Sequence, residues 1–337
     1  MNYFITGGTG FIGTHLTQLL HSLHPEANVY NLDIVEPGTP LPTVKNYHPA
    51  LRKGERLMSK YIYCDVRKPI HLKGIETSPE DVIFNFAAVH RTPGHPDIEY
   101  FETNIRGAEN VCAFAEEHGI KRMVFTSSIA PYGAAEELKE ETTLPTPNTP
   151  YGISKLVAEK IHMAWQAGGK DRQLTILRPG VVFGKGENGN FTRLYWAIRG
   201  YKFAYPGRKD TIKACIYVKE LVRFMLYRLE NHGEGVELYN CCYEPAYTIQ
   251  HIVEAMKKVT GLEVFVPDIP NWIIMPTAAV IGAMGAPMGI CPARVKKLQI
   301  STNICGEKLK NSGYKFKWAF EEALKDWFED NDKKWLK

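Results

Sequence analysis

The sequence predicts an α/β protein built on a doubly wound parallel sheet, with a smaller, mixed α/β domain beside it. Short apolar strands alternate with helical patterns over the first two-thirds of the chain, and a glycine-rich turn joins the first strand to the first helix. Continuous apolar strands separated by helices are typical of a parallel sheet covered on both faces. Right-handed crossovers then wind the sheet in both directions from its first strand. The length of 337 residues is enough for about two domains.

Each element of this fold is predicted from a local pattern. Apolar runs bounded by turn residues predict strands at residues 2–6, 29–33, 61–64, 82–86, 123–127 and 174–177. Helical spacing of apolar residues predicts helices at residues 10–23, 104–118 and 150–167. Residues 136–150 contain three prolines and are predicted as a surface loop before a helix. Beyond Arg178 the alternation weakens, which predicts the start of the smaller domain.

Composition excludes several classes of protein. Hydrophobic residues make up 44% and charged residues 23%, as in a globular protein rather than a disordered or fibrous one. A net charge of +4 is too small to indicate a nucleic-acid partner. The seven cysteines form no CxxC pair, and the 11 histidines show no HxxxH spacing. We therefore expect a reduced, cytoplasmic compartment, no disulfide framework and no metal site.

The sharpest signal is the glycine turn from Thr6 to Gly13, with the sequence TGGTGFIG. Gly7 allows a tight turn, Gly10 lets the backbone approach a pyrophosphate, and Gly13 permits close packing of the helix. The helix N-terminus supplies free N–H donors and the positive end of its dipole to the anion. Asp33 ends the next apolar strand, where its carboxylate accepts hydrogen bonds from both hydroxyls of an adenosine ribose and repels a 2′-phosphate. The pattern therefore indicates a Rossmann-type domain and favours NAD over NADP as the cofactor.

Tyr151 and Lys155 form a second motif, because residues four apart share one face of a helix. At ~5 Å and an effective dielectric constant near 20, the ammonium stabilises a phenolate by roughly 3 kcal/mol, enough to lower a tyrosine pKa of about 10 by around two units. The phenol then serves as a general base near neutral pH. Thr126, Ser127 and Ser128 end an apolar strand, so we expect their hydroxyls at the carboxyl edge of the sheet, where ligands bind. A hydroxyl beside a phenolate suits the oxidation of a substrate alcohol to a ketone.

Together these motifs resemble the extended short-chain dehydrogenase/reductase family, the NAD-dependent sugar epimerases and dehydratases, over essentially the whole chain. The resemblance also rests on Asp65, residues 85–88 (NFAA), Asn104, and Arg178-Pro179 followed by residues 182–184 (VFG). It implies that Ser128 orients a sugar hydroxyl and that Tyr151 abstracts its proton. It further implies that Lys155 binds the nicotinamide ribose and lowers the pKa of the tyrosine.

The predicted site has three groups of residues. The predicted catalytic residues are Ser128, Tyr151 and Lys155. The predicted NAD-binding residues are Gly7, Gly10, Phe11, Ile12, Gly13, Asp33, Asp65, Val66, Phe86, Ala87, Ala88, Asn104, Thr126, Ser127, Tyr151, Lys155 and Pro179. The predicted substrate-binding residues are His90, Ser128, Asn190, Arg193, Lys213 and Arg294. Two of these residues have an alternative interpretation. His90 is alternatively a loop histidine that binds the backbone, and Arg193 is alternatively a plain surface charge.

Departures from the family pattern narrow the reaction. The family's 4,6-dehydratases carry an Asp-Glu pair where this chain has Ile129 and Ala130, and neither of these side chains transfers a proton. Dehydration, and the decarboxylation that uses the Glu position, are therefore disfavoured, whereas epimerisation at C4 needs no further acid. Many members that bind nucleotide sugars have Asn in place of Val181 and Arg in place of Lys213, which weakens the case for a UDP-sugar. Lys213 still offers a cation to a diphosphate.

Within the family, residues 87–91, 178–193 and 293–297 are most similar to the branch that acts on a lipid-linked N-acetylglucosaminyl diphosphate. The uncharged run from Trp272 to Cys291 precedes the basic segment from Arg294 to Lys297. One hypothesis is that both contact the inner face of a membrane peripherally; the other is an internal helix and loop of the substrate domain. Prolines and glycines inside the run argue against a continuous spanning helix. From residue 294 to the end, 11 basic and 7 acidic residues account for the net charge of +4, which indicates either an anionic partner or a solvated surface.

We predict an NAD-dependent sugar 4-epimerase that acts on a diphosphate-linked hexose or N-acetylhexosamine, lipid-linked or UDP-linked, through a transient 4-keto intermediate. The alternatives are a net hydroxyl dehydrogenase or ketoreductase on a sugar or sterol-like alcohol, and a redox-sensing dinucleotide binder, which the Tyr/Lys pair disfavours. The resemblance predicts a homodimer through the helices at 104–118 and 150–167. The NAD-binding Rossmann domain is assigned to residues 1–178 with about 212–240, and the substrate-binding domain to residues 179–211 and 241–337.

Overall fold

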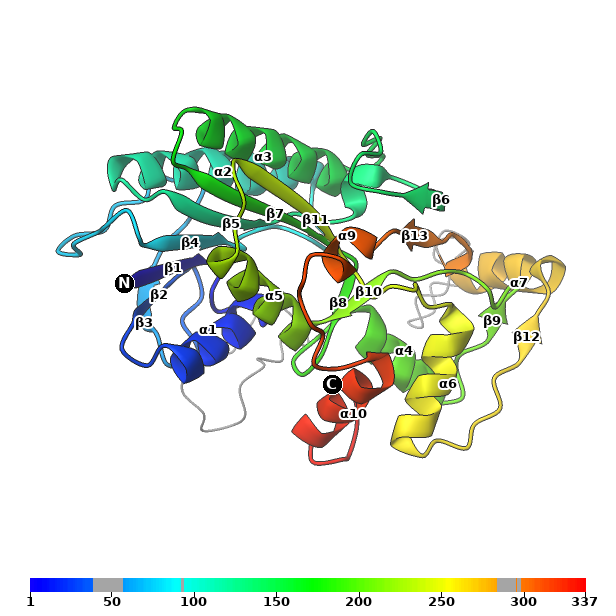
Figure 1. Cartoon of the computed structure of the whole chain (residues 1–337). Helices are drawn as coiled ribbons and strands as arrows, with labels where there is room; N and C mark the ends of the chain where they lie inside the picture. The colour runs from blue at the N-terminus through cyan, green and yellow to red at the C-terminus, as the bar shows by residue number, and fades with distance from the viewer. Residues whose placement is uncertain (39–56, 92–93, 284–294, 296–297) are drawn as a thin grey trace.

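The computed structural model describes residues 1–38, 57–91, 94–283, 295 and 298–337. Its centre is a seven-stranded parallel sheet in the order β11-β7-β5-β4-β1-β2-β3 (Figure 1). The strands are β1 (Asn2–Thr6), β2 (Asn28–Asp33), β3 (Lys60–Tyr63), β4 (Val82–Asn85), β5 (Arg122–Thr126), β7 (Gln173–Pro179) and β11 (Val236–Cys241). The chain winds outward from β1 in both directions, so the strand order reverses between β1 and β4. The predicted fold class is confirmed.

Helices cover both faces of the sheet (Figure 1). They are α1 (Phe11–Leu23), α2 (Asp97–Glu117), α3 (Pro150–Ala167) and α5 (Val218–Glu230). Along β1, Tyr3 and Ile5 join the apolar core formed with α1 and α5, whereas Phe4 joins the core formed with α2 and α3. Because successive side chains of a strand point to opposite faces, burial on both sides requires apolar residues at every position. This is why the strands read as continuous apolar runs.

Six of the seven sheet strands were predicted within about two residues at each end, and β11 was not predicted; β1 and α3 were predicted without error. Helix α2 begins at Asp97, before the predicted start at residue 104. The prediction missed this first turn because the turn is acidic and does not show the apolar spacing of a core helix. The loop predicted at residues 136–150 is wrong in part. Residues Ala135–Lys139 form strand β6, which pairs in parallel with β13 (Thr302–Ile304). Only Ala135 of β6 is buried, so the strand carries no local apolar signal.

The smaller, C-terminal part of the molecule is built from two short parallel strand pairs and several helices (Figure 1). The pairs are β8 (Val181–Phe183) with β10 (Cys215–Tyr217), and β9 (Tyr205–Pro206) with β12 (Asp268–Ile269). The remaining elements are η1 (Ala130–Tyr132), α4 (Asn190–Arg199), α6 (Ile249–Thr260), α7 (Asn271–Ala283), α9 (Glu307–Lys310) and α10 (Phe320–Asp330). Phe183 stacks on Phe191 with ring centroids 4.8 Å apart, in the core to which β8, β9, β10, α4, α6 and α10 contribute.

The uncharged run from Trp272 to Cys291 is helical in its first part, as α7, which contains Pro276. Residues 284–291, together with Arg294, Lys296 and Lys297, lie outside the described residues. In the part of the chain that the structure describes, no helix combines the length and the apolar character needed to cross a bilayer.

Candidate active site

The glycine turn at the carboxyl end of β1 leaves room only for backbone. Gly7 has φ +69°, and a Cβ there would lie 2.8 Å from the backbone nitrogen of Ala87. A Cβ on Gly13 would lie 2.6 Å from the Cα of Gly8, so α1 packs directly on its own turn. Gly10 caps α1 and, among the described residues, no side chain caps the first-turn N–H groups. These donors suit a pyrophosphate, so the turn fits the dinucleotide predicted from the sequence.

Phe11 and Ile12 leave only their backbone N–H groups for the predicted contact with the cofactor. Both side chains pack against apolar cores, and the ring of Phe11 meets His15 edge-on at 5.4 Å. Their side chains therefore hold α1 in place, and their N–H groups remain at the start of the helix.

Asp33, at the end of β2, is fixed beside the glycine turn. Its Oδ2 accepts a hydrogen bond from the backbone N–H of Thr9 at 3.0 Å, and its Oδ1 accepts one from Val35 at 3.0 Å. Burial raises the pKa of this carboxyl, and the two backbone hydrogen bonds lower it. A carboxylate oxygen has room for more than one hydrogen bond. Asp33 therefore has acceptor capacity left for the predicted contact with a ribose.

The next predicted cofactor residues, Asp65 and Val66, follow β3 in the chain. Arg67 donates from Nε to Oδ1 of Asp65 at 2.9 Å and from Nη2 to Oδ2 at 2.7 Å, and these hydrogen bonds lower the pKa of Asp65. Val66 is buried against α2, where a Cβ on Gly107 would lie 3.0 Å from its Cγ2. Arg67 orients the carboxylate and was not predicted from the sequence.

Asn104 ties the segment after β4 to two helices. Its Oδ1 accepts from the N–H of Val89 at 2.9 Å, and its Nδ2 donates to the carbonyl of Val89 at 3.1 Å. The same Nδ2 donates to Oγ of Ser154 on α3 at 2.8 Å. The side chain therefore positions residues 86–89, which include the predicted cofactor residues Phe86, Ala87 and Ala88.

Helix α3 presents the predicted base. The side chain of Thr149 accepts from the N–H of Gly152 at 3.1 Å, and Pro150 opens the helix, so Tyr151 lies in the first turn. A hydrogen bond joins Tyr151 to Ser128, as the predicted pairing of hydroxyl and phenol requires. Ser128 also accepts from the N–H of Ala130 at 3.1 Å.

The predicted lowering of the tyrosine pKa is wrong for the protein alone. Burial raises the pKa of Tyr151, and the hydrogen bond from Ser128 only partly offsets this increase. Lys155 has a buried side chain whose Nζ lies 4.5 Å from the ring centroid of Phe125. Burial lowers the pKa of Lys155 to about 7, with the charge of Glu159 acting in the opposite direction. The spacing of Tyr151 and Lys155 predicts an attraction between an ammonium and a phenolate. It does not reveal the free-energy cost of burying both charged groups, which raises the pKa of the tyrosine and lowers that of the lysine.

The other predicted residues lie around this centre. His90 follows β4. Burial of its ring and the charges of Arg91 and Lys155 lower its pKa, so it lies within electrostatic reach of the Lys155 ammonium. Arg193 donates to Oδ1 of Asn190 at 2.9 Å on α4. Lys213 donates to the carbonyl of Ile300 at 2.7 Å. Arg294 is outside the described residues.

Three predicted cofactor residues lie where β5 and β7 end. Thr126 is buried, and its Oγ1 has no hydrogen-bond partner among the described residues. Oγ of Ser127 donates to Glu159 at 2.5 Å. Pro179 ends β7, where it pairs with Cys241 of β11. Glu159 was not singled out from the sequence, although its position four residues beyond Lys155 places both on one helix face.

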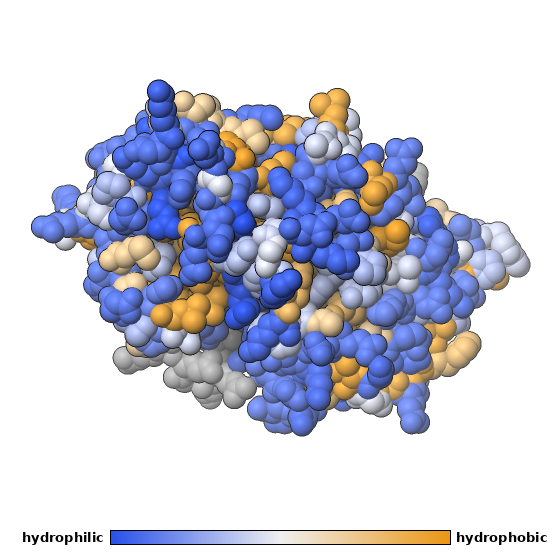
Figure 2. Space-filling model, viewed as in Figure 1, coloured by the Kyte–Doolittle hydropathy of each residue, from blue (hydrophilic) through white to orange (hydrophobic). Residues whose placement is uncertain are grey.

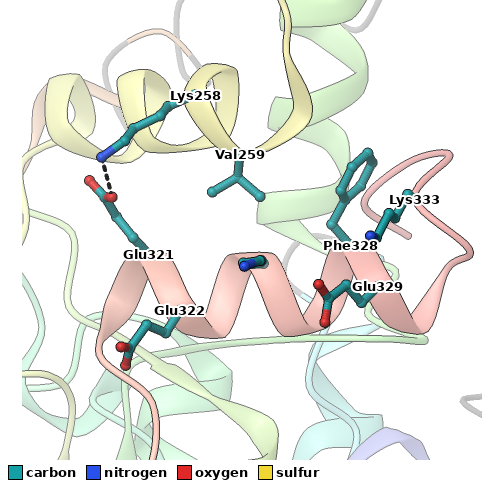
Figure 3. Close-up of a pocket in the computed structure, with 8 residues that line it drawn as sticks. Lys258, Val259, Glu321, Glu322, Phe328, Glu329 and Lys333 are labelled. Atoms are coloured by element: carbon teal, nitrogen blue, oxygen red, sulfur yellow. Dashed lines mark hydrogen bonds and ion pairs between the residues drawn. The ribbon is translucent and has the colours of Figure 1, made fainter.

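A surface groove of about 450 Å³ lies between α6 and α10, away from the residues described above (Figure 3). Lys258 and Glu321 form an ion pair of 2.6 Å across it. None of the predicted site residues that the structure describes lines the groove. Charged and polar side chains cover most of the face of the molecule that Figure 2 shows, so a groove of alternating charge is ordinary surface here.

Comparison with known proteins agrees with this geometry. The model of the NAD dependent epimerase/dehydratase family matches residues 3–242, and the chain belongs to that family. The recognition drawn from the motifs is thereby confirmed: the protein is an NAD-dependent epimerase of the extended short-chain dehydrogenase/reductase type, and NAD is its cofactor.

Several relatives match most of the chain. The N-acetyl-alpha-D-glucosaminyl-diphospho-ditrans,octacis-undecaprenol 4-epimerase of Escherichia coli is 28% identical over 328 residues, which cover 96% of this chain and 93% of the relative. The UDP-glucose 4-epimerase of Bacillus subtilis is 26% identical and covers 78% of this chain and 84% of its own length. The structure of the UDP-glucose 4-epimerase of Thermotoga maritima superposes with a TM-score of 0.71 at 20% identity, covering 99% of each chain. That likeness concerns the fold.

The burial of Lys155 generates a prediction about stability. Its pKa is about 7 in the folded protein and 10.5 ordinarily, so between these values the unfolded chain binds more protons and stability rises with pH. Lys155→Met removes the buried amine, so we expect a higher melting temperature at pH 7 and a gain that shrinks as the pH approaches 10. Calorimetry at several pH values measures this.

The matched control is Lys160→Met, which replaces an exposed lysine on the same helix and leaves the melting curve against pH unchanged. An equal gain for Lys155→Met at pH 7 and pH 10 contradicts the assignment.

Proposed function

We propose that the protein is a 4-epimerase of a diphosphate-linked hexose or N-acetylhexosamine, with the lipid-linked N-acetylhexosamine as the preferred substrate and the UDP-linked sugar as the second choice. The observation that carries the reaction is the hydrogen-bonded pair of Ser128 and Tyr151 at the carboxyl edge of the sheet, beside the glycine turn. The relative from Escherichia coli, whose name specifies the lipid-linked sugar, supports the preference because it aligns over 96% of this chain.

The side chains divide the reaction between them. Oγ of Ser128 holds the C4 hydroxyl of the sugar in place, and the phenolic oxygen of Tyr151 takes its proton and later returns it. On the same face of α3, the ammonium of Lys155 stabilises the phenolate, because a nearby positive charge favours the ionised form of a phenol. NAD, held by the glycine turn and Asp33, would supply a reversible hydride acceptor: the C4 hydrogen would leave with its electron pair and return to the other face of the 4-keto sugar, while the hydroxyl proton goes to Tyr151 and back.

The residues after Ser128 limit the outcome to epimerisation. Ile129 packs against the apolar cluster around Tyr132, and Ala130 begins the short helix η1. Neither side chain carries a proton, so water elimination from the 4-keto sugar has no acid or base at these positions. The keto sugar therefore turns over in the pocket and is reduced again.

A test of this function uses purified enzyme with GlcNAc-diphospho-lipid, UDP-GlcNAc and UDP-glucose, without added NAD. We expect the C4 epimer by NMR, no net NADH, and faster turnover of the lipid-linked sugar. The variant Tyr151→Phe keeps NAD affinity and loses turnover by about 10²–10⁴-fold, because proton transfer is removed. Stoichiometric NADH points instead to a net dehydrogenase, and full activity of Tyr151→Phe refutes the assigned base.

We also propose that the protein works at the inner face of the cytoplasmic membrane, through α7 and the segment before it. Phe265 is 85% exposed and Trp272 is 78% exposed, and α7 contains no charged residue. Exposed aromatic rings favour the interface of a bilayer, and Trp272 lies on the uncharged helix α7, whereas Phe265 lies between Glu263 and Asp268.

Sedimentation with vesicles that contain phosphatidylglycerol tests the contact. We expect binding by the wild type, weaker binding by Trp272→Ser because the interfacial ring is lost, and wild-type binding by the control Leu144→Ser, which removes a side chain of matched exposure (79%) before α3. Equal binding by all three proteins, or none by the wild type, contradicts the contact.

A homodimer through α2 and α3 completes the proposal. Both helices carry exposed apolar side chains: Ile98 is 58% exposed, Ile153 is 40% exposed and Val157 is 37% exposed. Burying this surface against a second copy removes apolar area from water. We expect analytical ultracentrifugation to show a dimer for the wild type and a monomer for Val157→Glu, because two buried carboxylates face each other; a dimeric variant contradicts this interface.

A further inference from the structure

The sheet-facing side of α3 carries an unusual number of polar groups. Tyr151, Lys155, Glu159 and His162 follow one another at intervals of three or four residues, which places them on one face of the helix. Lys155, Glu159 and His162 are all buried. Only the first two positions of this face belong to the predicted catalytic set, so the role of Glu159 needs an explanation.

Glu159 joins three elements of the fold. Its Oε1 accepts from Oγ of Ser127 at 2.5 Å and from Nε of Arg178 at 2.8 Å, and its Oε2 accepts from Nη2 of Arg178 at 2.6 Å. Ser127 follows β5 and Arg178 lies on β7, so one carboxylate on α3 holds the ends of two neighbouring strands. Ser127 is the chain neighbour of Ser128, whose hydroxyl pairs with Tyr151.

The carboxylate also balances charge around the ammonium. Two buried cations, Arg178 and Lys155, face Glu159, whose charge acts on both. The other titratable groups near Lys155 are Tyr151 and His162 on α3 and His90 after β4. Burial lowers the pKa of both histidines, that of His162 to about 4, so the His162 ring is uncharged near pH 7.

We propose that Glu159 is a positioning residue for catalysis: through Ser127 and Arg178 it sets the place of Ser128 against the Tyr151–Lys155 pair. The inference rests on the proposed function, because it concerns the same catalytic groups. It gives the buried bidentate pair a task beyond holding the fold together. Such pairs by themselves are weak evidence for stability.

The test compares Glu159→Gln with a matched pair elsewhere. Glu237 on β11 receives the same two-pronged contact from Arg228 on α5, at 2.9 and 2.5 Å. Glu159→Gln is expected to lower kcat about 10²-fold with a smaller change in KM. It is also expected to move the titration of Lys155, followed by NMR of labelled lysine, about one unit lower in pH. Glu237→Gln lowers stability but leaves kcat and the lysine titration unchanged.

A second variant keeps the test decisive if Glu159→Gln fails to fold. The double variant Glu159→Met/Arg178→Met replaces the buried charges by an apolar pair, a change that proteins often tolerate. We expect it to fold, to lose kcat and to shift the titration of Lys155 downward. Wild-type kcat and an unmoved titration in this variant overturn the inference, as does a Glu159→Gln variant that differs from wild type only in stability. The lysine titration needs no substrate, so it tests the inference even if the enzyme turns over none of the proposed sugars.

Discussion

The active site depends on the burial of charge against the carboxyl edge of the sheet. Lys155 and Glu159 of α3 and Arg178 of β7 are all buried, and a charge in such a place is stable only when it is paired and hydrogen-bonded. Two of the three hydrogen bonds that Glu159 accepts come from Arg178 and supply that pairing. Lys155 receives the longer-range attraction of the same carboxylate and lies over the ring of Phe125, but burial still leaves its proton weakly held. A base that must gain and lose a proton in each turnover benefits from a neighbour of this kind.

A second network joins α3 to the first half of the sheet. Oγ1 of Thr6 donates to Oδ1 of Asn85 at 2.7 Å, and Nδ2 of Asn85 donates to Nε2 of His162 at 3.1 Å. Nδ1 of His162 donates to the carbonyl of Ala158 at 2.7 Å, so the ring is held as one neutral tautomer. The residue that opens the glycine turn and the helix that carries the base are therefore connected through buried hydrogen bonds. Polar networks of this kind limit the number of ways in which a helix can pack on a sheet.

The cofactor side and the substrate side of the predicted site differ in how many contacts they make between segments far apart in the chain. The cofactor side is formed by turns directly after β1, β2 and β4, and each turn follows its strand in the chain. The substrate side draws Lys213 to the carbonyl of Ile300 and places Arg193 beside Asn190 on another helix. Lys213 and Ile300 lie far apart in the chain, so this part of the proposed substrate side forms only after folding. This division explains why the family and the cofactor could be recognised more readily than the substrate.

Apolar runs, the glycine turn and the spacing of Tyr151 and Lys155 were visible in the sequence, because each reflects a strand, a turn or one helix face within a few residues. From these patterns alone the order of elements, the fold class and the cofactor followed. Strand β6, the partners of Glu159 and the contact of Lys213 were decided by tertiary structure, since each joins segments far apart in the chain. The same holds for the pKa of Tyr151, because its direction depends on how much water the folded protein removes from the phenol.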